Sequence, residues 1–170
     1  DMKKSMQKKI EQIMLPVNPY TGLPLAEDPC IVTVSFVNET TAYEDKMTDA
    51  YYRNLAKEQY NEWLREKYPT RDALNKAWLD DGKGLADYED QFKGTVEVYG
   101  MNERSGGTRR GQDNLEFIGS IMETFTKDMS EHYRSIGGKQ LITTGTIWGS
   151  FPQAFIRSNE VADVMDYHAY

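Results

Sequence analysis

The chain has 170 residues, the length of one domain, and it is mildly acidic, with a formal net charge of −7. This balance argues against a nucleic-acid partner, because recognition of the phosphate backbone needs clustered Lys and Arg. No apolar run approaches a membrane span, and the start of the chain lacks the apolar core of a signal peptide. The compartment is therefore left open, with a secreted or periplasmic location slightly favoured.

The single cysteine, Cys30, excludes an internal disulfide. It lies at the start of an apolar stretch, where we expect a buried and inert thiol. The two histidines lie far apart in the sequence, without a cysteine or carboxylate cluster at ligand spacing, so neither a metal site nor an organic cofactor is predicted.

The first predicted element is a helix over residues 3–15, in which apolar side chains recur at helical spacing. Pro16 ends this helix, and the turn-rich segment 17–24 is predicted to be a loop. Residues 30–39 then form a nearly continuous run of β-branched and aromatic residues. Such a run predicts a strand buried on both faces, as in a parallel sheet covered by helices.

Two helices are predicted next. Aromatic and aliphatic residues recur at spacings of three and four from about residue 44 to residue 67, which predicts an amphipathic helix. Pro69 breaks the pattern, and Thr70 is positioned to cap a second, shorter helix. The following stretch, 80–111, is rich in Asp and Gly and is predicted to be an irregular, exposed loop.

The longest predicted helix starts at a capping box formed by Asp113 and Glu116 and ends at the glycine pair 137–138. A second strand over 141–148 follows, and a third over 161–170. The alternation of helices and strands predicts a parallel α/β sheet. Three strands alone leave two long edges unpaired, so we expect the chain to be a piece of a longer protein.

The predicted strands carry polar and aromatic residues at their carboxyl ends. Asn38 and Glu39 close the first strand, Trp148 the second, and His168 and Tyr170 the third. Because the carboxyl ends of neighbouring parallel strands share one rim, we expect these side chains to converge. The set suits a sugar: aromatic faces stack on the ring, an amide and an imidazole hold hydroxyls, and a carboxyl protonates a glycosidic oxygen.

These residues resemble a known family. A strand that ends in Asn38-Glu39, with a later strand that ends in His168-Ala169-Tyr170, is similar to the clan A glycoside hydrolases, which are (β/α)8 barrels. Residues 18–39 resemble cellulase-like members close to family 5. The stretch 61–78 resembles the excursion after strand four in those enzymes and in family 42 β-galactosidases. The resemblance covers nearly the whole chain.

The resemblance implies a fold: a partial (β/α)8 TIM barrel from about the third helix to the sixth strand. Residues 1–170 form one partial domain, with a helical excursion at about 40–111 after the first strand of the chain. The implied partners are an oligosaccharide or polysaccharide and the remainder of the barrel, supplied by the longer chain.

The resemblance also implies roles in a retaining hydrolase of β-linked glycans. Glu39 is the general acid/base, and Asn38 donates to the 2-hydroxyl of the sugar. His168 and Tyr170 line the crevice, and Trp148 is a looser match as a stacking residue. The second carboxylate, the nucleophile, falls on a later strand beyond Tyr170.

Other interpretations fit the same residues. Glu39 can be a solvated or salt-bridged strand-end residue, Asn38 starts a glycosylation sequon, and His168 can be a core histidine. Asp163 and Asp166 fall inside the predicted third strand, where carboxylates need partners that the sequence does not identify. At the level of the protein, the alternatives are a non-catalytic carbohydrate-binding or scaffold barrel and a self-sufficient small α/β domain.

Overall fold

A computed structural model describes most of the chain. The described residues are 2–39, 49–80, 83–98, 107–144, 156–157 and 159–166. They form two compact units, which are considered separately. The first unit comprises residues 1–41 and 119–170, and the second comprises residues 42–118. Helix α4, Arg109–Ser135, begins in the second unit and continues into the first.

The first unit begins with α1, Met2–Met14, whose bounds confirm the predicted helix. The N–H of Leu15 still donates to the carbonyl of Glu11 at 3.1 Å, and Pro16, which has no N–H, cannot extend this pattern. The predicted loop follows: Val17 forms an isolated antiparallel bridge with Pro24 and so closes the turn-rich segment on itself.

The strand predicted over 30–39 is short in the structure. Strand β1 is Thr33–Ser35, and its two end residues are exposed. Val32 is 67% exposed as well, so the prediction of burial on both faces is wrong. The reason is that Val34 and Phe36 pack against the core of this unit, whereas the described residues cover the opposite face of the strand only in part.

Cys30 is exposed, which corrects the prediction of a buried thiol. Its backbone N–H donates to the side chain of Asp28 at 2.9 Å, forming a turn. Because Cys30 lies in this turn, before the start of β1, its side chain is not part of the sheet.

The sheet of the first unit is parallel, as predicted. Strand β1 pairs with β2, Leu141–Thr143, in parallel, with Thr33 opposite Leu141 and Ser35 opposite Thr143. On the third predicted strand, Val164 forms an isolated parallel bridge with Thr143. Among the described residues this one bridge is all that the predicted third strand contributes to the sheet.

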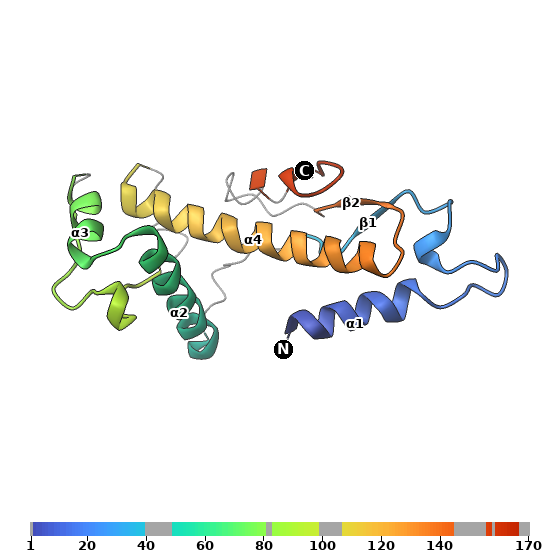
Figure 1. Ribbon diagram of the computed structural model, residues 1–170, viewed down its shortest axis with the longest axis horizontal. Helices are drawn as coiled ribbons and strands as arrows, with labels where there is room; N and C mark the ends of the chain where they lie inside the picture. Colours follow the sequence, from blue (N-terminus) through green and yellow to red (C-terminus); the bar gives the residue numbers. More distant parts are fainter. Residues whose placement is uncertain are drawn as a thin grey trace. The chain divides into compact units, whose positions relative to one another are not determined.

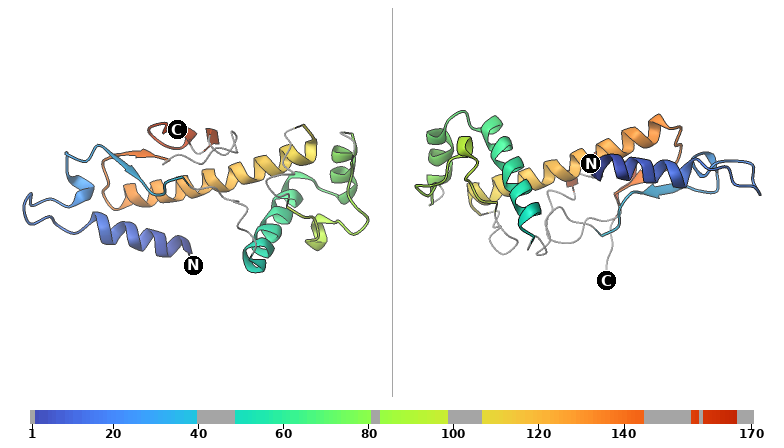
Figure 2. Two further views of the ribbon diagram at one scale, coloured as in Figure 1. Left: turned by 180° about the vertical axis from the view of Figure 1, so that it is seen from behind. Right: turned by 90° about the horizontal axis from the view of Figure 1, so that it is seen from below.

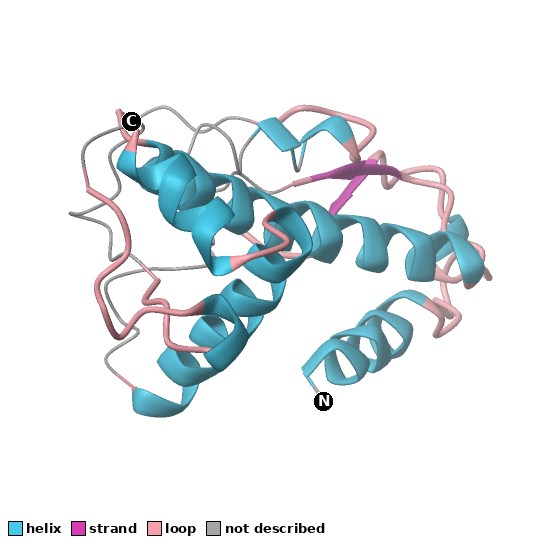
Figure 3. Ribbon diagram, turned by 60° about the vertical axis from the view of Figure 1, so that its left-hand side comes forward, coloured by secondary structure: helices cyan, strands magenta, loops and turns pink. Residues whose placement is uncertain are grey.

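The core of the first unit lies between α1, the sheet and the C-terminal part of α4 (Figures 1 and 3). The ring of Phe36 meets that of Tyr133 edge-on, with the centroids 5.9 Å apart, and so joins the end of β1 to the helix. Each large apolar side chain buried in this way contributes about 1.5–3 kcal/mol. The buried members of the core are Ile10, Met14, Ala26, Met129, Tyr133 and Ile142.

Helix α4 does not begin at the predicted capping box. Its N-terminal turn is capped by Thr108, whose hydroxyl accepts the N–H of Gly111 at 3.1 Å. Asp113 instead lies inside the helix and is fully buried. The predicted end is confirmed, because Gly137 adopts a left-handed φ of 94°. A Cβ atom on Gly138 would lie 2.4 Å from the ring of Tyr133, so this position requires glycine.

The second unit contains α2, Ala50–Lys67, and α3, Arg71–Leu79 (Figures 1 and 2). The side chain of Asp49 caps α2, and Thr70 caps α3 as predicted, with its hydroxyl 3.1 Å from the N–H of Ala73. The start of the first predicted helix, at about residue 44, falls outside the described residues.

A buried carboxylate joins the helices of the second unit. Asp113 accepts hydrogen bonds from the Tyr68 hydroxyl at 2.7 Å and from the Trp78 indole N–H at 2.8 Å. The cations of Lys67 and Arg109 lie 3.1 and 3.3 Å from its other oxygen. These donors explain why Asp113 is buried in the helix rather than exposed as a cap.

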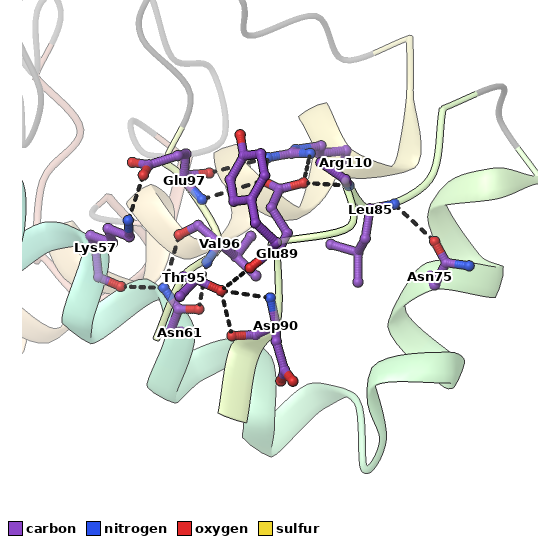
Figure 4. Close-up of polar contacts among 12 residues, drawn as sticks. Lys57, Asn61, Asn75, Leu85, Glu89, Asp90, Thr95, Val96, Glu97 and Arg110 are labelled. Atoms are coloured by element: carbon purple, nitrogen blue, oxygen red, sulfur yellow. Dashed lines mark hydrogen bonds and ion pairs between the residues drawn. The ribbon is translucent and has the colours of Figure 1, made fainter. Parts of the chain in front are cut away.

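The loop of the second unit, residues 83–98, is held by polar contacts (Figure 4). The side chain of Asn61 accepts the N–H of Val96 at 3.1 Å and donates to its carbonyl at 2.9 Å. Glu89 is buried and accepts two bonds from Arg110, at 2.5 and 2.9 Å. The predicted exposed loop over 80–111 is therefore wrong in part, since Glu89 and Val96 are buried and residues 109–111 belong to α4.

Candidate active site

The predicted acid/base lies just past the carboxyl end of β1. The chain leaves the strand after Ser35, whose hydroxyl donates to the carbonyl of Val37 at 2.6 Å. Asn38 is exposed and Glu39 is half-buried. Because β1 and β2 are parallel, this end is also the carboxyl end of β2.

The side chains of β1 divide between the two faces of the sheet. Val34 and Phe36 pack on the core beneath the sheet, while Thr33 and Ser35 belong to the opposite face.

Glu39 has an unusual backbone conformation. Its φ is 49°, and it is the one non-glycine residue with positive φ in the described part of the chain. A left-handed conformation costs an L-residue roughly 1–2 kcal/mol, because Cβ crowds the following carbonyl. Strain of this kind is concentrated at functional sites, where the surroundings hold a side chain in a required place.

The carboxyl end of β2 is tied to the segment that follows Asn159. The hydroxyl of Thr143 donates to the carboxylate of Asp166 at 3.2 Å, and that of Thr144 donates to the amide oxygen of Asn159 at 3.1 Å. Both threonines are buried. The segment that leads to the predicted third strand end is therefore anchored beside the end of β2.

The amino end of the same segment is anchored to β2 and α4. One carboxylate oxygen of Asp163 accepts the backbone N–H of Ile142 at 2.8 Å and a guanidinium N–H of Arg134 at 2.5 Å. These contacts, with that of Asp166, supply the partners that the sequence could not identify.

Residues 6–170 match the β-galactosidase family, family 42 of the glycoside hydrolases. The chain belongs to glycoside hydrolase family 42. Neither the search of curated proteins nor that of solved structures found a match. The resemblance to clan A with a likeness to family 42 is thereby confirmed, and family membership implies a carbohydrate substrate. The likeness to cellulases near family 5 stays a prediction.

Family 42 membership and the structure agree on the broad fold class. The described residues combine helices with a small parallel sheet, and the TIM barrel is inferred from the family. The assignment of residues 1–170 to one partial barrel domain stays a prediction. So does the convergence of the site residues, because Trp148, His168 and Tyr170 lie outside the described residues.

Two residues beside the carboxyl end of β2, Thr143 and Asn159, were not predicted. Thr143, Asn159 and Asp166 are joined by hydrogen bonds at the rim, whereas the sequence analysis singled out only Asp166, without naming a partner. The sequence feature that could have predicted them is the threonine pair 143–144 in an apolar strand, because buried hydroxyls require hydrogen-bond partners.

The described residues contain neither a metal-binding cluster nor a helix that could span a membrane. No three His, Cys, Asp or Glu side chains are grouped in a way that could hold a metal ion. None of the helices in this part of the chain combines the length and apolar character needed to cross a membrane.

Proposed function

We propose that this family 42 chain is part of a retaining glycoside hydrolase that cleaves O-glycosidic bonds in β-galactosides, with Glu39 as the general acid/base. The observation that carries the proposal is the family match over residues 6–170. The location of Asn38 and Glu39 just past the end of a parallel strand supports it. The substrate class extends to β-linked glycans that present such a terminal sugar.

In this mechanism Glu39 first protonates the glycosidic oxygen of the leaving group and later removes a proton from the attacking water. Asn38 binds the 2-hydroxyl of the sugar, a contact that strengthens in the transition state. A second carboxylate, about 5–5.5 Å from the first, forms the covalent glycosyl-enzyme intermediate. We place that nucleophile on a strand beyond Tyr170, in the remainder of the barrel.

The residues outside the described part complete the proposed site. His168 and Tyr170 line the sugar pocket beside the nucleophile, and Trp148 stacks on a sugar ring. Binding by aromatic faces and neutral hydrogen-bonding groups suits an uncharged saccharide, and the chemistry proceeds without a metal or organic cofactor.

The proposal is tested by Glu39→Gln in the full-length protein. We expect the rate on galactosides with poor leaving groups to fall by about 10²–10⁴-fold, because protonation of the leaving oxygen is lost. Aryl galactosides with acidic phenol leaving groups should lose much less in the first step, since they depart without a proton. Steady-state kinetics on both substrate series measures the difference.

Glu27→Gln is a matched control for this substitution. Glu27 is exposed and paired with Lys139 at 3.0 Å, so its loss should leave both rates unchanged. A Glu39→Gln protein with the normal rate on poor leaving groups contradicts the assignment of Glu39. A wild-type protein that binds galactosides but hydrolyses none favours the non-catalytic carbohydrate-binding alternative.

A further inference from the structure

The third segment of the sheet is attached to β2 mainly through side chains. Its backbone contributes little: the N–H groups of Asp163 and Val164 both donate to the carbonyl of Ile142, at 2.9 and 3.1 Å. A single bridge of this kind specifies register weakly. A slip by one residue would turn every following side chain to the other face of the sheet.

Three polar residues fix the register that the single backbone bridge specifies only weakly. Thr143 donates from β2 to the carboxylate of Asp166 at 3.2 Å. The amide oxygen of Asn159 accepts the hydroxyl of Thr144 at 3.1 Å and the backbone N–H of Asp166 at 3.3 Å. Asp166 is therefore held through its main chain and its side chain at once, from two directions.

Covalent geometry connects this anchor to the proposed site. His168 follows Asp166 by two residues, and an extended chain advances at most about 3.3–3.6 Å per residue. A shift or rotation of Asp166 is passed directly to the residues that we propose to contact the sugar.

We infer that Thr143, Asn159 and Asp166 form a positioning cluster for the galactosidase reaction. The cluster fixes the backbone and the side chain of Asp166, which precedes His168 and Tyr170 by two and four positions in the sequence. The inference rests on the proposed function. Its members touch no substrate; they act through the residues that follow Asp166.

Thr143→Val in the full-length protein tests the cluster, because it removes the hydroxyl and keeps the β-branched shape. Small misplacements of reacting groups cost up to about 10²-fold in rate, so we expect kcat to fall about tenfold or more, with KM within about threefold. Thr143→Ser restores the hydroxyl and should restore kcat.

Thr126→Val is the matched control. Thr126 is a buried threonine on α4, and its substitution should change thermal stability without changing kcat. Wild-type kinetics in Thr143→Val overturns the inference, and so does a Thr143→Ser protein as impaired as Thr143→Val. Both outcomes are measured on protein shown to be folded by circular dichroism.

A second pair of variants keeps the test decisive if Thr143→Val does not fold. Asp166→Asn retains an oxygen that can accept from Thr143, whereas Asp166→Ala does not. We expect kcat to fall in the order wild type, Asp166→Asn, Asp166→Ala, and equal kcat values in all three overturn the inference. Glu39→Gln, assayed in parallel, reports on the proposed function alone. Suppose that Glu39→Gln has a normal rate, while Thr143→Val is impaired and Thr143→Ser is active. This result rejects Glu39 as the general acid/base but keeps the positioning cluster.

Discussion

At the scale of single residues, Glu39 combines a reactive group with an unfavourable backbone conformation. Its φ of 49° lies in the left-handed region, where glycine is at ease and asparagine is tolerated, but glutamate is rarely found. A residue selected only for stability at this turn would be glycine or asparagine. The conformation of Glu39 therefore supports its proposed role as the general acid/base.

Replacing Glu39 with glycine should separate stability from activity. We expect Glu39→Gly to leave the free energy of unfolding unchanged or to raise it by about 0.5–1 kcal/mol, because the left-handed strain is relieved. Hydrolysis of galactosides with poor leaving groups should be lost in the same protein. Urea denaturation and steady-state kinetics measure the two effects, with Glu39→Ala as the strained comparison.

A Glu39→Gly protein less stable than Glu39→Ala would contradict the strain argument. The comparison is informative because both substitutions remove the carboxylate, and only the glycine removes Cβ.

At the scale of elements, Asn61 is the buried side chain that joins helix α2 to the loop over 83–98, beside the contacts of Lys57 with Glu97 and of Arg65 with the carbonyl of Gln91. Asn61 is completely buried and pairs with both main-chain groups of Val96, as a neighbouring strand would. Its amide also donates to the carbonyl of Lys57 at 2.7 Å, which fixes the rotamer. The loop thus obtains from a helix the main-chain partners that a sheet would otherwise supply (Figure 4).

Asn61→Ala should weaken this attachment strongly. The substitution leaves two main-chain groups of Val96 buried without their partner, at a cost of about 1–3 kcal/mol each. We expect the free energy of unfolding to fall by about 2–4 kcal/mol and amide exchange to accelerate over residues 83–98. Urea denaturation and hydrogen exchange provide the measurements.

Asn54→Ala is the control on the same helix, because Asn54 is exposed. It should change the free energy of unfolding by no more than about 0.5 kcal/mol. Equal effects of the two substitutions would show that Asn61 does not hold the loop.

At the scale of the whole molecule, two buried groups with opposite pKa shifts, Tyr68 and Glu89, contribute to the pH dependence of stability. Burial raises the pKa of Tyr68 to about 12, and its hydrogen bond to Asp113 acts in the same direction, while that from Arg109 opposes it. Burial acts to raise the pKa of Glu89 too, but the bonds from Arg110 and from the backbone N–H of Ala86 outweigh it, so the pKa is lowered.

The two shifts act at opposite ends of the pH scale. Neutral Tyr68 is favoured in the folded state, so its contribution is complete below pH 10 and is lost as the pH rises towards about 12. Ionised Glu89 is favoured in the folded state, so its contribution is complete above pH 4.5 and is lost as the pH falls through the lowered value.

Alkaline titration tests the contribution of Tyr68 to stability. We expect the free energy of unfolding to fall by on the order of 2 kcal/mol between pH 10 and 12 from Tyr68 alone. Tyr68→Phe should lower stability at neutral pH and flatten the alkaline slope. Urea denaturation across this range gives the slope, and ultraviolet absorbance follows tyrosine ionisation. An unchanged slope in Tyr68→Phe would assign the alkaline transition to other groups.

Much of the local structure was predictable from the sequence. The helices at 2–14 and 71–79, and the end of α4 at the glycine pair, followed from apolar periodicity, a capping threonine and proline or glycine stops. These signals act over a few residues and do not depend on the rest of the fold. The parallel direction of the strands also followed, because helical connections between strands impose it.

Tertiary structure decided which polar residues are buried and what they bind. Asp113 matched a capping box in the sequence, yet it is buried because Tyr68 and Trp78, 45 and 35 residues away, donate to it. The partners of Asp163 and Asp166 likewise come from β2 and α4. A carboxylate is accepted in a core only where donors from distant segments replace water, and no local pattern encodes their arrival. The sequence by itself thus determined the helices at 2–14 and 71–79, the end of α4 and the parallel direction of the paired strands, whereas tertiary contacts decided which side chains the interior holds.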